Sequence, residues 1–422
     1  MPLMEAASIK NDDSVTASQP TAKAVDEASL HYPGWRVVLA CFLAAMFCWG
    51  FGLYGHGVYL TELQRLHGWP TSLISGAVTG FYLLTAVFVV FISDAIARLG
   101  PKLVMLGGML CFGSAVALLA VITAPWQLYL VYMVMAAGAA TMHVGAISNV
   151  VGLWFNRKRP LAISLALNGA SSGGILVTPA LVLAISYFGF PASILGAMLL
   201  VAAVLLPAIA FWVDRPAGRG VDAAATAAAA GWTRRTALRS RKFWSVAAPF
   251  AMALTAQVGF LVHQIAIVEP SVGRAQAGLS VGLLTVTALI GRIALGAWAG
   301  RLDLRRFMAW SLASQAVALL AMALTSDNAV LLIACAVYGF SAGNLVTLPS
   351  LVIQREFEAA AFGMLVGLSW AITQFTYAFG PGIMGALRDV AGSYVAALAL
   401  CIALKIGAGV LILLRPGSDR AD

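Results

Sequence analysis

The feature that most constrains this chain is a succession of apolar stretches, each about as long as a helix that crosses a bilayer. A spanning helix needs roughly 20 apolar residues, and 61% of the 422 residues are hydrophobic while 10% are charged. A soluble domain does not bury that much apolar surface. We therefore expect an all-α membrane protein. The sequence predicts twelve spans, at 35–60, 72–93, 103–124, 127–153, 161–187, 191–213, 243–268, 278–300, 307–325, 329–353, 361–386 and 394–414.

The basic residues predict the orientation of these spans. With both termini in the cytoplasm, the inner segments hold 21 lysines and arginines, and the outer loops hold Arg65, Arg274 and Arg388. This bias follows the positive-inside rule. The net charge of +9 then indicates contact with anionic lipid, and we expect no nucleic-acid partner because no basic groove pattern accompanies it. The predicted location is the plasma (inner) membrane, with multiple passes.

The chain divides around a polar stretch at 214–242. We expect a disordered cytoplasmic tail at 1–33, an N-terminal six-helix half at 34–213, a cytoplasmic linker at 214–242, a C-terminal six-helix half at 243–415 and a short tail at 416–422. The second part of the linker, "WTRRTALRSRKFW", is typical of a short amphipathic helix on the membrane surface or of basic flanking sequence. The five cysteines lie in apolar runs without metal-ligand spacing, so we expect no metal site, disulfide or cofactor.

The two halves repeat each other. "ARLGPKLVM" (97–105) and "GRLDLRRFM" (300–308) match at an offset of 203, and Pro179 matches Pro381 at an offset of 202. A parallel repeat of six spans is typical of secondary transporters that hold their substrate between two halves related by a pseudo-twofold axis. We expect that architecture, with alternating access to a site near the middle of the membrane.

Residues 34–415 resemble the major facilitator superfamily (MFS). The segments "ARLGPK" and "GRLDLRR" are similar to the family's loop motif and its repeat. The resemblance implies conformational roles for a set of charged residues. These are Asp94, Arg98, Lys102, Arg301 and Arg305. The family usually has an aspartate before the arginine, whereas Ala97 and Gly300 stand there, so the usual charge latch between the halves is incomplete.

A narrower resemblance is to the monocarboxylate and oxalate/formate transporter branch. It is carried by "LWFNRKRPLAISLALNGASSGG" (153–174), by "GWRVV" (34–38) and by Arg292 in span 8. The branch implies that Arg292 binds the carboxylate of the substrate. The chain departs from it in three places: span 8 has no acid, span 1 has no lysine, and span 11 has no cation before Arg388. The identity of the substrate and its coupling are therefore not implied.

Polar residues at mid-membrane depth come from spans 4, 5, 7, 8, 10 and 11. They are the predicted substrate-binding residues Arg292, His143, Asn168, Gln257, Asn344, Gln374 and Tyr377. For Asn168, Gln257 and Asn344, hydrogen bonds between packed helices are an equal alternative. For His143, a neutral buried histidine is the more common role. Residues expected in a gate or vestibule are His56, Tyr54, His263 and Gln264. Lys405 has no role that the sequence indicates.

Three functions remain open. The preferred one is a monomeric carrier of a small organic anion, monocarboxylate-like, with protons or a counter-anion as the open coupling partners and His143 as the first candidate proton site. The alternative is an exporter of a neutral solute or drug, in which Arg292 is structural. A sensor that does not transport is the third, although the polar tails are too short for a soluble domain. We do not expect an enzyme, because no nucleophile or metal cluster is present.

Overall fold

The computed structural model describes residues 27, 29, 31–155, 158–214, 233–298, 301–358 and 361–414, and within these ranges it contains helices and no strand. The predicted tail 416–422, most of the tail 1–33, residues 215–232 of the predicted linker and Gly300 lie outside them. Eleven helical segments among the described residues are long and apolar enough to cross a membrane. The predicted twelfth, span 11, consists of two helices of 16 and 13 residues, each too short to cross alone.

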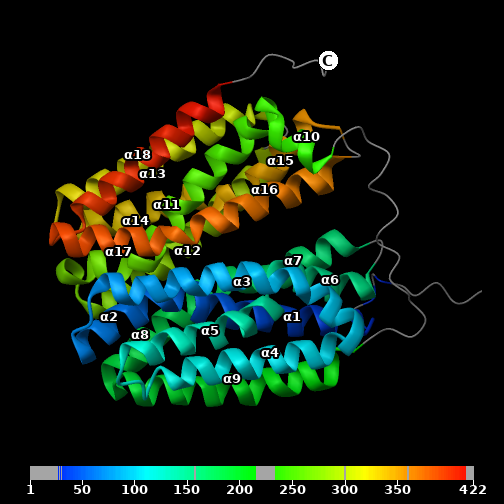
Figure 1. The fold of residues 1–422 in the computed structure, drawn as a ribbon, viewed down its shortest axis with the longest axis horizontal. Coiled ribbons are helices and arrows are strands. Elements are labelled where there is room, and N and C mark those ends of the chain that lie inside the picture. Colours follow the sequence, from blue (N-terminus) through cyan, green and yellow to red (C-terminus); the bar gives the residue numbers. More distant parts are fainter. Residues whose placement is uncertain are drawn as a thin grey trace, which may run out of the picture.

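The helices form two bundles that lie side by side, α1 to α9 in one and α10 to α18 in the other (Figure 1). In the N-terminal bundle the elements are α1 Gly34–Trp49, η1 Gly50–Tyr54, α2 Gly55–His67, α3 Thr71–Leu99, α4 Pro101–Leu118, α5 Pro125–Thr141, α6 Val144–Trp154, α7 Arg159–Ser172, η2 Gly173–Val177, α8 Thr178–Phe188 and α9 Phe190–Trp212. The first span, α1 to α2, runs to His67, seven residues beyond its predicted end at 60.

The C-terminal bundle repeats this arrangement. Its elements are α10 Arg234–Arg239, α11 Arg241–Val272, α12 Arg274–Trp298, α13 Leu304–Leu324, α14 Asn328–Ala342, η5 Gly343–Val346, α15 Leu348–Glu356, α16 Phe362–Tyr377, α17 Phe379–Ala391 and α18 Val395–Leu413. Local sequence sets several helix starts. Asp303 accepts the amide hydrogen of Arg305 at 3.1 Å, and Asp327 accepts that of Val330 at 3.0 Å, which satisfies amides that the first helical turn leaves free.

Five spans are interrupted. Spans 1 and 5 contain single π-helical turns, η1 and η2. Span 4 breaks at His143 between α5 and α6, span 10 passes through the 3₁₀ turn η5, and span 11 breaks at Ala378. Glycine is present in both π turns and in η5, and it lowers the preference for regular helix. The sequence predicted these spans as continuous helices because their apolar composition continues through each break.

Small residues bring neighbouring helices into backbone contact. A Cβ added at Gly169 in α7 would lie 2.0 Å from the carbonyl oxygen of Phe42 in α1. In the other bundle, a Cβ added at Gly343 would lie 2.0 Å from the carbonyl oxygen of Ala288 in α12. These distances are far below van der Waals contact. The segments "NGASSGG" and "GFSAGN" are therefore the surfaces at which helices approach closely, as expected for small residues in membrane helix packing.

We predict that Gly343→Ala destabilises the protein by about 1–3 kcal/mol, because a methyl group must displace backbone atoms in a packed interface. Gly107→Ala is the matched control, since an added Cβ there meets nothing within 4 Å. The measurement is thermal unfolding of both purified variants in detergent. Equal melting temperatures for the two variants would contradict the close α12–η5 contact.

Candidate functional site

The predicted polar residues cluster at the interrupted helices. Tyr54 ends η1, His143 separates α5 from α6, Asn344 lies in η5, and Tyr377 ends α16. Asn168 lies in α7, five residues before η2 begins. Broken helix at membrane depth is tolerated where protein or a water-filled cavity surrounds it, and single π turns occur often at functional sites. The interruptions therefore mark the zone between the two bundles as the candidate binding site.

Arg292 lies in α12, half-buried, with its Nε donating to the carbonyl oxygen of Gly343 over 3.3 Å. None of the ion pairs found among the described residues includes it. A guanidinium has five N–H donors and remains protonated in proteins. One long hydrogen bond leaves most of these donors available, so this charge can accept an anionic partner.

Arg292 also faces the opposite bundle. Tyr54, from the first span, lies within electrostatic range of its guanidinium. A Cβ added at Gly174 in η2 would lie 2.4 Å from Thr285 Oγ1 and 2.9 Å from the Tyr54 ring. The turn of α12 that carries Thr285, two turns before Arg292, therefore packs directly against spans 1 and 5. This contact joins the two bundles next to the arginine.

Two of the predicted substrate-binding residues are buried amides whose oxygen atoms have no partner among the described residues. They are Oε1 of Gln257 in α11 and Oδ1 of Asn344 in η5. The Asn344 Nδ2 group donates to Phe340, at 3.4 Å. Asn344 directly follows Gly343, whose carbonyl binds Arg292. Buried amide oxygens nearly always accept a hydrogen bond, so these two are available to a ligand or to water.

Two further predicted substrate-binding residues, His143 and Tyr377, pack against aromatic rings. The His143 imidazole stacks on Trp49 of α1 with 5.6 Å between ring centroids. Tyr377 meets Tyr82 of α3 edge to face at 5.4 Å, which is a contact between the bundles. Asn168 and Gln374 are half-buried in α7 and α16. The binding roles of these four residues stay predictions.

Three residues expected in a gate or vestibule are fully buried in this conformation. His56 is enclosed by aromatic rings, with Phe81 at 4.8 Å and Tyr132 stacked at 5.3 Å between centroids. His263 is bonded to Tyr394 Oη at 3.1 Å and to the carbonyl of Pro381 at 3.0 Å. Sequence depth placed these residues near the outer end of their spans, and helix rotation turned them into the bundles.

Gln264 lies inside the C-terminal bundle in the same way. Its Nε2 donates to Ser280 Oγ over 3.1 Å. Tyr54 is the one residue of the predicted gate group that lies at the contact between the bundles, beside Thr285.

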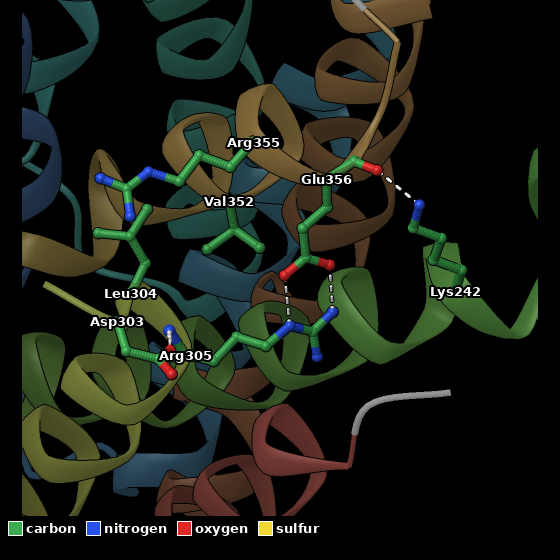
Figure 2. A pocket seen from close by; sticks show the side chains of 7 residues that line it. All are labelled: Lys242, Asp303, Leu304, Arg305, Val352, Arg355 and Glu356. Carbon is green, nitrogen blue, oxygen red and sulfur yellow. Dashed lines mark hydrogen bonds and ion pairs between the residues drawn. The ribbon is translucent and has the colours of Figure 1, made fainter. Parts of the chain in front are cut away.

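The loop-motif residues differ between the two halves. Asp94 and Arg98 are exposed in α3, and Lys102 is half-buried in α4. Arg301 is also exposed. Arg305, the counterpart of Lys102, is buried and forms a two-pronged ion pair with Glu356, at 2.6 and 2.7 Å (Figure 2).

Arg305 also donates to the carbonyl oxygen of Ile412 and to Ser245 Oγ, both at 2.9 Å. Its side chain therefore joins the ends of spans 7, 9, 10 and 12 beside a cavity of about 450 Å³. The backbone carbonyl of Glu356 accepts from Lys242 at 2.5 Å. Because its donors are satisfied within one bundle, Arg305 has a structural partner set that Arg292 lacks.

A network of four charges joins the bundles at their opposite end, here called the Arg65 end. Glu62 accepts hydrogen bonds from Arg65 at 2.9 Å and from Arg274. Arg65 also pairs with Glu269 at 2.6 Å. Nearby, Asp389 accepts the amide hydrogen of Ser72 at 2.7 Å. The Arg65 end is therefore closed in this conformation.

The network could not be predicted from the sequence, because its four residues are separated by up to 212 positions. The available signal was weak: two of the three arginines predicted in outer loops, Arg65 and Arg274, have a glutamate within five residues. Spacing alone did not show that the two segments meet.

The fold and site together define a membrane carrier of two bundles, and comparison with known proteins agrees. Residues 40–269 match the model of the Major Facilitator Superfamily, so the chain belongs to this family. It is an integral, multi-pass membrane transporter of the MFS type, as the sequence predicted.

Individual relatives refine the comparison. The chain is 26% identical to monocarboxylate transporter 13 of Rattus norvegicus, covering 90% of this chain and 89% of the relative. It is 26% identical to monocarboxylate transporter 3 of the same organism over 86% of this chain and 75% of the relative. Among solved structures, the nucleoside transporter NupG matches with a TM-score of 0.71 at 13% identity, over 90% of this chain and 99% of NupG. That likeness shows the fold alone.

We predict that Glu62→Gln shifts the carrier toward conformations open at the Arg65 end. The variant removes the carboxylate charge that both arginines contact, and a change of one to two kcal/mol alters a two-state ratio about five- to thirty-fold. Spin labels at the exposed residues Leu66 and Val390, with exposed Cys111 replaced by serine, would report the distance between the bundles. Glu358→Gln, at an exposed carboxylate in the C-terminal bundle, is the control. An unchanged distance distribution in Glu62→Gln would exclude the network as a closing element.

Proposed function

We propose that the protein carries a small organic anion, monocarboxylate-like, by alternating access, with the substrate carboxylate paired to Arg292. The observation that carries the proposal is the state of Arg292 at the contact between the bundles. This cation forms one long hydrogen bond and has no carboxylate partner among the described residues. An arginine at the centre of a span costs about 2.5–3.5 kcal/mol on insertion scales. A bound anion offsets that cost where the protein does not.

The chemistry of the guanidinium favours a carboxylate. Its planar donors bind both carboxylate oxygens at once, and this bidentate pair is stronger than neutral hydrogen bonds. Asn344 and Gln257 are the candidates for further hydrogen bonds from the C-terminal bundle. His143, Asn168, Gln374 and Tyr377 complete the proposed set. A site built from both bundles allows the substrate to draw them together.

Charge also links binding to movement in this proposal. In the empty carrier, closure around Arg292 removes water from an incompletely paired charge, and desolvation of a charge is unfavourable. In the loaded carrier, the carboxylate neutralises that charge, and their attraction strengthens as the local dielectric falls. The loaded form should therefore change sides more readily than the empty one. Coupling to a proton, coupling to a counter-anion and uncoupled transport all fit this proposal, and His143 is the first candidate proton site.

The relatives support the substrate class in a limited way. Two curated relatives are named as monocarboxylate transporters, and the substrate in their names is a property of those proteins. At about a quarter identity, the substrate is carried over here only as a proposal. It is consistent with the cation at the site, and no acidic residue within the described spans occupies that depth.

A second candidate is export of a neutral solute or drug, with Arg292 structural. The observation that favours it is the hydrogen bond from Arg292 to the carbonyl of Gly343. Backbone carbonyls do compensate buried cations in membrane proteins. The two candidates differ in whether removal of the charge abolishes binding of carboxylates.

We predict that Arg292→Gln lowers carboxylate affinity by about 10- to 100-fold, because hydrogen bonds to charged groups contribute about 1.5–3 kcal/mol. Arg292→Lys should recover little, since a lysine lacks the planar fork. The measurement is a thermal-shift and uptake screen of purified protein against mono- and dicarboxylates, followed by affinity determination for the best ligand.

The fold control for this experiment is Arg306→Gln, which removes an exposed arginine of α13. Both variants must elute as monodisperse protein from size exclusion. Wild-type affinity in a folded Arg292→Gln variant would favour the neutral-solute candidate instead.

Orientation is a separate proposal. The distribution of basic residues supports cytoplasmic termini, with the linker on the same side and the Arg65 end outside. The proposed location is the plasma (inner) membrane. This orientation would make the present conformation closed to the outside.

We predict that Arg235→Cys is protected from an impermeant thiol reagent added to intact cells, whereas Val390→Cys reacts. Both positions are exposed, so accessibility to water is matched and only the side of the membrane differs. Cys111 is replaced by serine in both. Labelling in lysed cells verifies that each cysteine can react. The reverse labelling pattern would invert the topology.

A further inference from the structure

Lys405 is a second cation at membrane depth with few partners. It lies in α18 and is fully buried, facing the interior of the C-terminal bundle. Its Nζ donates to the carbonyl oxygen of Ala253 in α11 over 2.8 Å and lies 5.4 Å from the ring centroid of Tyr338 in α14. An ammonium has three donors. Among the described residues, one donor forms a hydrogen bond and the ammonium adds one cation–π contact.

Arg305 is a permanently charged residue in the same bundle, and its partners can be compared with those of Lys405. It is buried to a similar degree, but it has both oxygens of Glu356, a backbone carbonyl and a hydroxyl as partners. Lys405 has no ion pair among the described residues. Unlike arginine, a lysine can lose its proton when it is buried. The difference in partners therefore points to a lysine that is neutral for part of the time.

Neighbouring helices carry further buried polar atoms that have no partner among the described residues. They are both amide atoms of Gln315 in α13 and the hydroxyl of Tyr338, all fully buried. Ser311 Oγ donates to the carbonyl of Ser341 at 3.0 Å, and Gln315 and Tyr338 stand one turn further along these two helices. Helix α18 packs on α13 in matching register, since Gly409 faces Leu312. Helices α11, α13 and α14 thus place polar groups at the level of Lys405.

The lysine is connected to the candidate substrate site through α11. In an α-helix, the carbonyl of Ala253 accepts the amide hydrogen of Gln257. Lys405 binds this same carbonyl, so its contact falls on the turn that carries Gln257. The Gln257 side chain has an unpartnered Oε1 and is 9% exposed, whereas Lys405 is completely enclosed. A change at Lys405 can therefore reach the site through one helical turn.

The titratable groups around Lys405 are few. Cys401 lies one turn away on α18, and Tyr338 faces it from α14. Arg305 of α13 is bonded near the end of α18, and His263 of α11 is held by Pro381 and Tyr394. Met384 of α17 contacts Cys401. No described carboxylate forms an ion pair with Lys405. A sealed site of this kind excludes ions and solutes, but a proton can enter through buried water and polar groups.

We propose that Lys405 is a proton-binding site inside the C-terminal bundle, and that its charge state controls how firmly the Gln257 turn of α11 is held. The protonated amine donates to the Ala253 carbonyl and faces the Tyr338 ring. The neutral amine accepts a hydrogen bond from Gln315 Nε2 or Tyr338 Oη. The reaction is the gain or loss of one proton at Nζ. The proposal goes beyond carboxylate transport and does not depend on which solute is carried.

The test needs no substrate. We compare thermal unfolding of the wild type, Lys405→Met and the control Lys158→Met from about pH 6 to about pH 9 in detergent. Methionine keeps an unbranched side chain that is one atom shorter, and it removes the proton site. The wild type and the control should show a pH-dependent change in melting temperature of about 2–4 °C that Lys405→Met lacks. Superimposable pH profiles of wild type and Lys405→Met would overturn the proposal. The result of the Arg292→Gln binding experiment does not bear on it, so the two proposals fail independently.

If Lys405→Met does not fold, Gln315→Met and Tyr338→Phe test the same site from its surroundings. Each removes polar atoms that the neutral amine would contact and leaves the lysine in place. We expect the midpoint of the pH profile to move in both variants, and an unchanged midpoint in both would overturn the proposal. Binding of the carboxylate chosen by the screen, measured against pH in the same variants, then reports the link to Gln257.

Discussion

Hydrocarbon offers no hydrogen bonds, so a helix that breaks within the membrane must be surrounded by protein or by water in a protein cavity. Five spans of this chain are interrupted, and their interruptions carry Tyr54, His143, Asn344 and Tyr377 or lie close to Asn168. The two bundles provide that surrounding. The close glycine contact of α1 with α7 joins two interrupted spans, and that of α12 with η5 holds a broken segment against a continuous helix. The location of the candidate site follows from this requirement.

The chain compensates its buried cations in different ways, and the differences carry the functional argument. Arg305 has a full partner set within one bundle, so its role is to hold the ends of four spans together. Arg65 and Arg274 share Glu62 across the two bundles, so their pairing depends on the conformation of the carrier. Among the described residues, Arg292 and Lys405 each form a single side-chain hydrogen bond, to a backbone carbonyl. Incomplete compensation in a low dielectric is the condition under which a ligand or a proton has a large effect.

The ion pairs at the Arg65 end close one end of the carrier in this conformation. Ion pairs between partly exposed groups are weak individually, about 0.2–1 kcal/mol each, but a shared, buried carboxylate such as Glu62 couples two of them. A weak closure of this kind suits a carrier, because a strongly stabilised conformation would not exchange with the other. The substrate then needs only a few kcal/mol of preferential binding to change the balance.

Most of the architecture could be predicted from the sequence. The length of the apolar stretches and the alternation of basic residues indicated twelve spans and their grouping. This works because the free energy of transferring a side chain into lipid depends mainly on its residue type. Arg292 was identified on the same basis. The sequence did not predict the helix breaks, since glycine-rich apolar segments are compatible with both continuous and broken helix. It placed His56 and His263 near a vestibule, because depth along a span does not specify which way a side chain faces.

The membrane-spanning pattern, the internal repeat and the presence of an arginine at mid-membrane depth were thus determined by the sequence itself. The tertiary structure decided which charges meet. The Glu62 network, the Arg305–Glu356 pair and the enclosure of Lys405 join residues that lie 51 to 212 positions apart. Such contacts depend on the rotation and register of packed helices. Small residues allow the helices to approach, but no single position in the sequence specifies that rotation or register.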